Sequence, residues 1–302
     1  MTATLPVSRV ALIARTKLSQ ALDTMREAAE WLDAHGCTPV IEEESARAAG
    51  LADRWPTAPR TTLAVGVDVV LTFGGDGTLL DAADAVMHAA SDVPLMGINL
   101  GRLGFLTEVD RSQMTVALAD LLAGRSRLET RAMLEGRILR DRRDGGSGTV
   151  ACERIALNDV VVSRTALSRM IELDVEVDGQ FVCHVKADGL IVATATGSTA
   201  YNLSAAGPIL HPSVDAFVLT PIAPHTLTLR PLVLPANARI ELRPTGDVNA
   251  EMVATFDGQY GVRVAMGDVV TIARAPRVLR LIHTSPRTYF DMLREKLKWG
   301  NP

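Results

Sequence analysis

The glycine-rich turn at 74–78, with the sequence GGDGT, constrains this chain more than any other segment. The apolar run at 69–73 precedes it and predicts a buried strand, and the stretch at 79–88 indicates a helix. A strand, a glycine turn and a helix in this order are typical of a parallel sheet. The backbone N–H groups of such a turn, with those of the helix N-terminus, form a binding site for an anion such as phosphate.

Asp76 lies in the middle of this turn, and two interpretations of it are open. Beside a bound phosphate it is a candidate acid or base. As a structural residue it caps the following helix. The turn by itself does not decide between the two.

Composition narrows the class of protein. The 302 residues suggest two domains or one large one, and 47% hydrophobic with 22% charged residues is ordinary for a soluble globular protein. The net charge of −4 gives no electrostatic case for nucleic acid or an anionic membrane as a partner. No apolar run reaches the ~18 residues that span a bilayer. The start of the chain predicts a strand at 10–14 and no signal peptide, and three scattered cysteines without a CxxC motif favour a reduced, cytoplasmic location.

The first part of the chain, 1–127, predicts a doubly wound α/β domain that carries the GGDGT turn. Ligands bind beyond the carboxyl ends of the strands in such a sheet, and Asp76 and Asn99 both lie at such ends. Residues 43–63 are mixed in composition and are expected to form surface structure. The expected elements are strands at 10–14, 38–41, 69–73 and 93–99, and a helix from about 19 to 35.

The pattern changes near residue 128, where turns replace helices. Residues 128–275 predict an antiparallel, sandwich-like β domain. Asp178 and Gly179 are expected to form a two-residue hairpin turn, and 140–148 a polar hairpin loop. The last segment, 276–302, is expected to pack back on the first domain through an amphipathic helix from 286 to about 299.

Several enzyme signatures are absent from the sequence. There is no GxxxxGK[ST] phosphate loop, no GxGxxG dinucleotide fingerprint and no GxSxG nucleophile elbow. The histidines show no metal-ligand spacing such as HExxH, so no protein-bound metal site is expected.

Four polar, glycine-rich segments remain as candidates. NLGRLGFL at 99–106 follows a strand, and its structural interpretation is a turn capped by Asn99. Asn158 and Asp159 lie inside an apolar run, where they indicate either a bulge or edge strand, or a ligand contact. Asp188 begins DGLIVA and is either a turn residue or a ligand contact. The segment at 197–208 combines small residues, hydroxyls and one tyrosine, which suits a nucleoside pocket.

In this order, these segments resemble the motifs of the NAD kinase family of bacterial type. The matching motifs are GGDGT at 74–78, NLGRLGFL at 99–106, LND at 157–159, DGLIVAT at 188–194, TGSTAYNLSAAGP at 196–208, TPIAPH at 220–225 and DGQ at 257–259. GGDGT alone is shared with lipid kinases, whereas the combination with TGSTAY is far more specific. The resemblance covers about residues 5–300.

The resemblance implies transfer of the γ-phosphate of ATP to the 2′-hydroxyl of the adenosine ribose of NAD. Asp76 would accept the proton of that hydroxyl, as general base. Asp188 would contact NAD, across a subunit interface in some members. The phosphate side would be lined by Gly75, Gly77 and Thr78, and NAD hydroxyls or ring edges would be bound by Asn158 and Asp159. The adenine would be held by Thr199, Ala200, Tyr201, Asn202, Leu203 and Ser204. Further ligand contacts would come from Arg169, Lys186 and Gln259.

The resemblance also implies partners and a cofactor. The partners would be small nucleotides, with no nucleic acid and no membrane. The family uses a divalent ion, usually Mg²⁺, together with ATP. Its members are homodimers or homotetramers, with the NAD site near the subunit interface.

Two departures from the family pattern are informative, at positions 159 and 206, and Lys186 lies at a position where family members differ. Asp159 replaces a glutamate, which shortens the reach of the carboxylate. Ala206 replaces a glycine, which predicts that residue 206 does not need a positive φ. Lys186 is positively charged, as in members restricted to ATP, whereas members that also use polyphosphate tend to have a small neutral residue there.

Two other functions remain as alternatives. A lipid kinase of the diacylglycerol type shares GGDGT but needs a lipid pocket where this chain has TGSTAY. A non-catalytic NADP(H) sensor would keep the fold but would not need Asp76. We expect Asp76→Asn to abolish most activity with little loss of fold.

Overall fold

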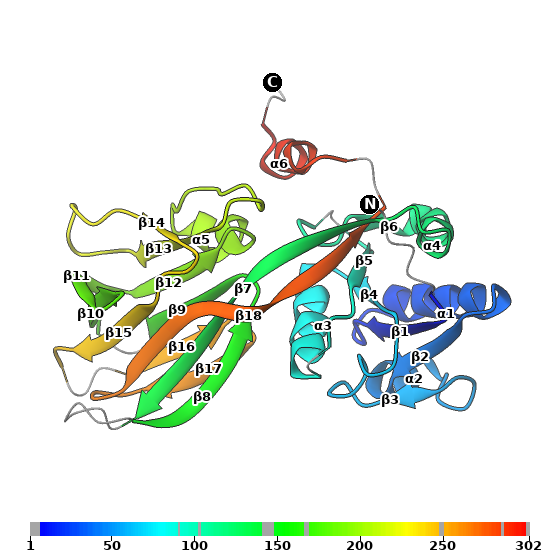
Figure 1. The fold of residues 1–302 in the computed structure, drawn as a ribbon, viewed down its shortest axis with the longest axis horizontal. Coiled ribbons are helices and arrows are strands. Elements are labelled where there is room, and N and C mark those ends of the chain that lie inside the picture. The colour runs from blue at the N-terminus through cyan, green and yellow to red at the C-terminus, as the bar shows by residue number, and fades with distance from the viewer. Residues whose placement is uncertain are drawn as a thin grey trace. The chain divides into compact units, whose positions relative to one another are not determined.

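The computed structural model describes residues 7–89, 91–101, 104–140, 148–165, 169–247, 251–284 and 287–299. The chain forms two compact units (Figure 1). Unit 1 comprises Met1–Thr130 and Leu279–Pro302, and unit 2 comprises Arg131–Val278. The chain passes from unit 1 to unit 2 within β7 (Arg127–Arg140) and returns within β18 (Val269–His283).

Unit 1 is built on a parallel sheet, as the alternation of strands and helices predicts. Its strand order is β18-β5-β4-β1-β2-β3, with β6 paired to β5 (Figure 1). Each of these pairings is parallel. The strands are β1 (Arg9–Ala14), β2 (Thr38–Glu42), β3 (Thr57–Ala58), β4 (Val69–Gly74), β5 (Leu95–Asn99) and β6 (Val109–Asp110).

The helices of unit 1 include one that the sequence patterns do not reveal. Within the segment expected to be only surface structure, α2 begins after Glu42, whose carboxylate accepts a hydrogen bond from the Ser45 N–H, and ends at Gly50 with φ of 67°. The region also contributes β3 to the sheet. The helices are α1 (Ser19–Ala34), α2 (Glu43–Ala49), α3 (Asp76–His88), the 3₁₀ turn η1 (Arg111–Gln113), α4 (Met114–Leu122) and α6 (Tyr289–Leu297).

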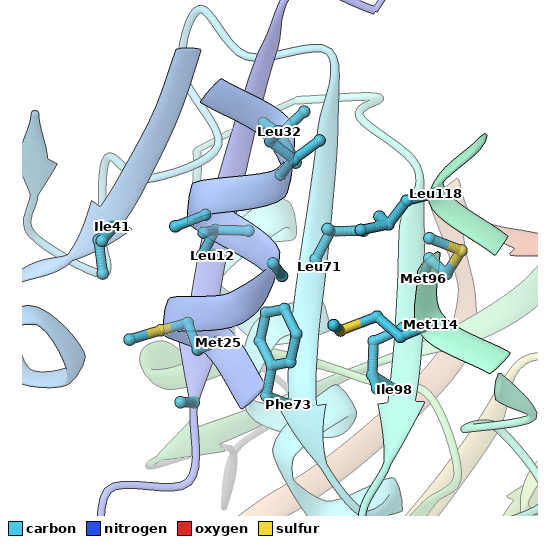
Figure 2. Packing of buried hydrophobic residues seen from close by; sticks show 14 of the residues in the cluster. Leu12, Met25, Leu32, Ile41, Leu71, Phe73, Met96, Ile98, Met114 and Leu118 are labelled. Carbon is cyan, nitrogen blue, oxygen red and sulfur yellow. The ribbon is translucent and has the colours of Figure 1, made fainter. Parts of the chain in front are cut away.

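Helices cover both faces of this sheet. Figure 2 shows Met25 of α1 and Met114 of α4 packed against the same face of the strands, around Phe73. On β5, Met96 and Ile98 belong to the buried cluster on this face, so the side-chain position of Gly97 between them lies on the opposite face of the sheet. A Cβ on Gly97 would lie 3.0 Å from Leu79 Cδ1, which places α3 on that face. Gly97 therefore lets α3 approach the sheet closely.

Unit 2 consists of two antiparallel sheets around one core, as expected for a β-sandwich. One sheet has the order β14-β13-β12-β9-β16-β17, and the other contains β11-β10-β15-β18 with the β7–β8 hairpin. Side chains of both sheets, such as Val192 and Leu242, share one buried cluster. The strands are β8 (Thr149–Ala156), β9 (Asp159–Arg164), β10 (Ile171–Val177), β11 (Gln180–Ala187), β12 (Gly189–Thr194), β13 (Ala216–Ile222), β14 (Leu232–Pro235), β15 (Ile240–Thr245), β16 (Met252–Phe256) and β17 (Tyr260–Val264).

Two Asp-Gly turns close hairpins in unit 2. Asp178 and Gly179 have φ of 51° and 76° and connect β10 to β11, which confirms the predicted two-residue turn. Asp257 and Gly258 have φ of 51° and 66° and connect β16 to β17. The expected polar loop at 140–148 joins the paired strands β7 and β8, but its residues 141–147 lie outside the described residues.

The C-terminal helix α6 is shorter than its amphipathic pattern predicts. It begins at a capping box in which Thr288 and Asp291 bind each other's backbone N–H groups. Met292 is buried, and Lys296 Nζ lies 5.6 Å from the Phe105 ring centroid in the same unit. In the part of the chain that the structure describes, no helix is both long and apolar enough to cross a membrane.

Candidate active site

The GGDGT turn joins β4 to α3 in unit 1. A Cβ on Gly74 would overlap the hydroxyl of the buried Thr78, so Gly74 is needed for packing. Gly75 and Gly77 differ, because a Cβ on either would meet no atom of the described residues within 4 Å, and neither has a positive φ. Neither packing nor conformation requires glycine at these two positions. The turn therefore leaves open space at the N-terminus of α3, where an anion binds favourably.

Asp76 is the first residue of α3, but its side chain does not cap the helix. Its Oδ1 accepts hydrogen bonds from the N–H groups of Leu106 (3.1 Å) and Thr107 (3.0 Å) and from Thr107 Oγ1 (2.9 Å). Its Oδ2 accepts one from the Phe105 N–H (2.7 Å). All four donors come from the segment 105–107, so the helix-cap interpretation of Asp76 is wrong.

The segment 104–107 thus forms a cradle for the Asp76 carboxylate. A Cβ on Gly104 would overlap Asp76 Oδ1, so glycine is required there. Asn99 is buried at the end of β5, accepts a hydrogen bond from the Gly101 N–H (2.9 Å) and donates one to the Thr107 carbonyl (3.4 Å). Asn99 therefore shapes this loop, as its turn interpretation predicts.

In unit 2, the carboxylate of Asp257 holds the LND segment. It accepts hydrogen bonds from the N–H groups of Leu157 (2.8 Å), Asn158 (2.7 Å) and Asp159 (3.1 Å). From the DGQ tract, the sequence predicts only Gln259 as a site residue. Asp257 could have been found from its position as the first residue of a two-residue hairpin turn.

Asp159 is a buried acid whose carboxylate receives no hydrogen bond from the described residues. It is 4% exposed. Burial, together with the nearby charge of Asp257, raises the pKa of Asp159 to about 7. Strand β9 lies between β12 and β16 with regular register, which excludes an edge strand or a bulge at Asp159. A buried carboxylate without donors favours the ligand-contact interpretation.

The segment 194–208 forms a compact loop with the 3₁₀ turn η2 (Gly197–Thr199) and the short helix α5 (Tyr201–Ser204). A Cβ on Gly197 would overlap the Asn158 backbone, which brings this loop against the LND segment. Thr194 reinforces that contact, because its hydroxyl donates to the Leu157 carbonyl (2.6 Å) and accepts from the Gly197 N–H (3.0 Å).

The predicted adenine-binding residues divide into two groups. Asn202 is fully buried, donates to the Ser198 (2.9 Å) and Pro208 (3.0 Å) carbonyls and accepts from Thr220 Oγ1 (2.7 Å). Its amide therefore supports the loop from inside. The others are half-buried or exposed, and so are accessible to a ligand: Thr199, Ala200, Tyr201, Leu203 and Ser204.

The prediction that residue 206 does not need a positive φ is wrong. Ala206 has φ of 62° and follows the end of α5, at a position where helices commonly end with a left-handed glycine. The methyl group of an L-residue in this conformation costs about 1 kcal/mol. The chain tolerates that strain.

We therefore expect Ala206→Gly to raise the thermal midpoint by a few degrees, since it removes about 1 kcal/mol of backbone strain. Ala205→Gly is the matched control, because Ala205 has an ordinary φ of −89° and should lose stability when made glycine. Differential scanning calorimetry of the three proteins checks this. An equal loss of stability in both variants would contradict the strain at Ala206.

Four further predicted contacts lie in unit 2, three of them in ion pairs. Asp188 Oδ1 lies 2.7 Å from Arg164 Nε, and Lys186 Nζ lies 2.5 Å from Glu172 Oε1. The other two are exposed: Arg169, with its NH1 group 3.4 Å from Asp247 Oδ2, and Gln259. Among the described residues, no group of three or more His, Cys, Asp and Glu side chains is arranged to hold a metal ion.

Two family models match the chain, and together they cover most of it. The ATP-NAD kinase N-terminal domain matches residues 10–126, and the ATP-NAD kinase C-terminal domain matches residues 157–284. Each match contains one of the two sets of residues described above.

Full-length relatives and solved structures agree with these models. The NAD kinases of Citrifermentans bemidjiense and Geotalea daltonii are 41% and 42% identical over 97% of this chain and 99% of their own. An NAD kinase from Archaeoglobus fulgidus, in complex with ATP, superposes with a TM-score of 0.74 at 25% identity, over 96% of this chain and 98% of its own. Yeast NADH kinase, complexed with NADH, shares the fold with a TM-score of 0.87 at 23% identity, over 98% of this chain and 89% of its own. With near full-length relatives at this identity and both domains matched, the chain belongs to the NAD kinase family.

Proposed function

We propose that this protein is an NAD kinase that transfers the γ-phosphate of ATP to the 2′-hydroxyl of the adenosine ribose of NAD, giving NADP and ADP. The observation that carries the proposal is the Asp76 carboxylate, held by four hydrogen bonds beside the open N-terminus of α3. Phosphoryl transfer depends on positioning and charge stabilisation, which this arrangement supplies.

In the proposed reaction Asp76 acts as general base. The ribose 2′-oxygen forms a bond to the γ-phosphorus while the bond from that phosphorus to the β,γ-bridging oxygen breaks, and ADP leaves. The proton of the 2′-hydroxyl passes to the Asp76 carboxylate. The N–H groups at the start of α3, near Gly75, Gly77 and Thr78, would bind phosphate oxygens.

Unit 2 would bind NAD. Asp159 supports this assignment, because a buried carboxylate without a donor is suited to accept hydrogen bonds from ribose hydroxyls. Asn158 lies beside it, on the backbone that Asp257 holds. Tyr201 is 47% exposed and offers a ring face for the adenine to stack on.

Mg²⁺ would enter with ATP. The ion is usually held by substrate phosphates and one or two carboxylates, so it does not need a cage of protein ligands. The ion would offset the charge of the transferred phosphate.

Lys186 bears on the choice of phosphate donor. We expect this enzyme to prefer ATP to polyphosphate, although the side chain of Lys186 is ion-paired with Glu172. We also expect a homodimer or homotetramer with Asp188 near the interface. Efficient turnover with polyphosphate would contradict the first expectation, and a monomer by light scattering would contradict the second.

The test of the proposed function is a product assay. The purified protein is incubated with Mg-ATP and NAD, NADH or diacylglycerol, and NADP(H) is measured with an NADP-specific dehydrogenase. We expect NADP from NAD, and the NADH arm measures the choice between the two dinucleotides. Phosphorylation of the lipid alone, or NADP(H) binding without turnover, would support an alternative function instead.

Gly77→Ala separates phosphate binding from stability. Alanine has room at this exposed helical position, and it should raise the free energy of unfolding by up to about 1 kcal/mol. The same methyl group would occupy space proposed for phosphate, so kcat/KM for ATP should fall about tenfold or more. Gly261→Ala, in β17, is the control and should leave kcat/KM unchanged. A Cβ added at Gly261 would have ordinary contacts at 3.4 Å and 3.7 Å. Unchanged activity in a stabilised Gly77→Ala variant would contradict the phosphate site.

A further inference from the structure

Thr107 donates more hydrogen bonds to the Asp76 carboxylate than any other described residue. It is fully buried, just before β6, and both its N–H (3.0 Å) and its Oγ1 (2.9 Å) donate to Asp76 Oδ1. The Leu106 N–H also donates to Oδ1, whereas Oδ2 receives one hydrogen bond, from the Phe105 N–H. The two oxygens of the carboxylate are therefore not equivalent.

This asymmetry selects the oxygen that remains available. A carboxylate oxygen has two lone pairs, so three donors leave Oδ1 without capacity for another, while Oδ2 can accept one more. We infer that Thr107 is a positioning residue that fixes the Asp76 carboxylate with Oδ2 presented as the proton-accepting atom. The inference rests on the proposed function, in which Asp76 receives the proton of the ribose 2′-hydroxyl.

Both branches of the Thr107 side chain serve this role. A Cβ on Gly97 would overlap the Thr107 γ-methyl, so this methyl group occupies the space that glycine leaves in β5. A β-branched side chain that packs through its methyl group has a fixed χ1, which aims the hydroxyl at Asp76. The other three donors are backbone N–H groups, which most substitutions retain. The Thr107 hydroxyl is thus the one donor that a substitution can remove.

The test compares Thr107→Val and Thr107→Ser with the unmodified enzyme, by kcat, KM and the pH dependence of kcat. Valine keeps the shape and removes the hydroxyl. We expect kcat to fall about tenfold, with KM for NAD and ATP changed less than about twofold. The acid limb of the pH profile should move about one pH unit upward, because a donor that stabilises the ionised carboxylate is lost. Serine restores the hydroxyl, and kcat should return to within about threefold of the unmodified enzyme.

Thr72→Val is the matched control. Thr72 is also fully buried, lies opposite Gly97 on β4, and its hydroxyl has no hydrogen-bond partner among the described residues. We expect this variant to keep its kcat and its pH profile, so it measures the effect of a buried threonine-to-valine change by itself.

The outcomes separate the inference from the proposed function. If Thr107→Val keeps its kcat and its pH profile, or loses activity only as it loses thermal stability with no shift in the profile, the positioning role is overturned. If the valine variant does not fold, Thr107→Ser decides, and a shifted acid limb in that variant overturns the role. No NADP formation by the unmodified protein would contradict the proposed function itself.

Discussion

Asp76→Asn is expected to lower kcat for NADP formation by about 10²- to 10⁴-fold, the usual contribution of a general base. An amide cannot accept the proton of the ribose hydroxyl, so the transfer loses its base while the substrates still bind. Steady-state kinetics with NAD and Mg-ATP measure this, and KM should change less than kcat. Asp84→Asn is the matched control, because Asp84 is a carboxylate of the same helix, paired with the exposed His88.

The same substitution should also lower stability, although the fold is retained. The carboxylate accepts hydrogen bonds on both oxygens, so the NH₂ group of asparagine must face at least one N–H donor of the segment 105–107. An unsatisfied buried donor costs about 1–3 kcal/mol. We expect a lower thermal midpoint with a retained fold. Near-full activity in this folded variant would contradict the role of Asp76 as base.

Asp159→Asn is expected to stabilise the protein at neutral and alkaline pH. The pKa of Asp159 is raised from an ordinary 3.8 to about 7 by burial and by Asp257, so the folded state binds the proton more tightly than the unfolded state does. Stability is therefore lost as the pH rises from about 4 to about 7, and the full cost persists above that range. The loss in free energy of unfolding is at most about 4 kcal/mol, and it belongs to the coupled pair of Asp159 and Asp257 rather than to Asp159 alone.

Asparagine has nearly the same shape and no charge, so it removes this cost. The thermal midpoint of the variant should exceed that of the unmodified protein near pH 8 by several degrees, and the difference should vanish near about pH 4. Activity should fall at the same time, because the carboxylate is proposed to bind NAD. Asp53→Asn, at an exposed position, should change neither quantity. Equal midpoints of the Asp159 variant and the unmodified protein near pH 8 would contradict the proposed cost of the buried charge.

Local patterns predicted the elements whose structure depends on nearby residues. The alternation of apolar runs and helices predicted the parallel sheet of unit 1, and Asp178-Gly179 predicted a hairpin because both residues tolerate a positive φ. The position of Asp76 after β4 likewise follows from the turn itself. In each case the determining contacts lie within a few residues.

Tertiary contacts decided the rest. The donors to Asp76 lie about thirty positions away in the chain, and Asp257 binds the LND segment across 98 to 100 positions, so no local pattern reveals either. Ala206 adopts a left-handed φ that its residue type disfavours. The backbone on either side of it is held by Asn202, whose side chain donates a hydrogen bond to the Pro208 carbonyl. Helix α2 is short, and its cap comes from Glu42, which is not a typical capping residue.

The central claim is that Asp76 is the base in phosphate transfer from ATP to NAD. Rapid-quench measurement of that transfer from γ-labelled ATP, in a single turnover at saturating NAD, tests it most directly. We predict label at the 2′-position of NADP, and a transfer rate at least about 100-fold lower in folded Asp76→Asn, with NAD and ATP binding nearly unchanged. A folded variant that transfers the label within about threefold of the unmodified rate would contradict the claim.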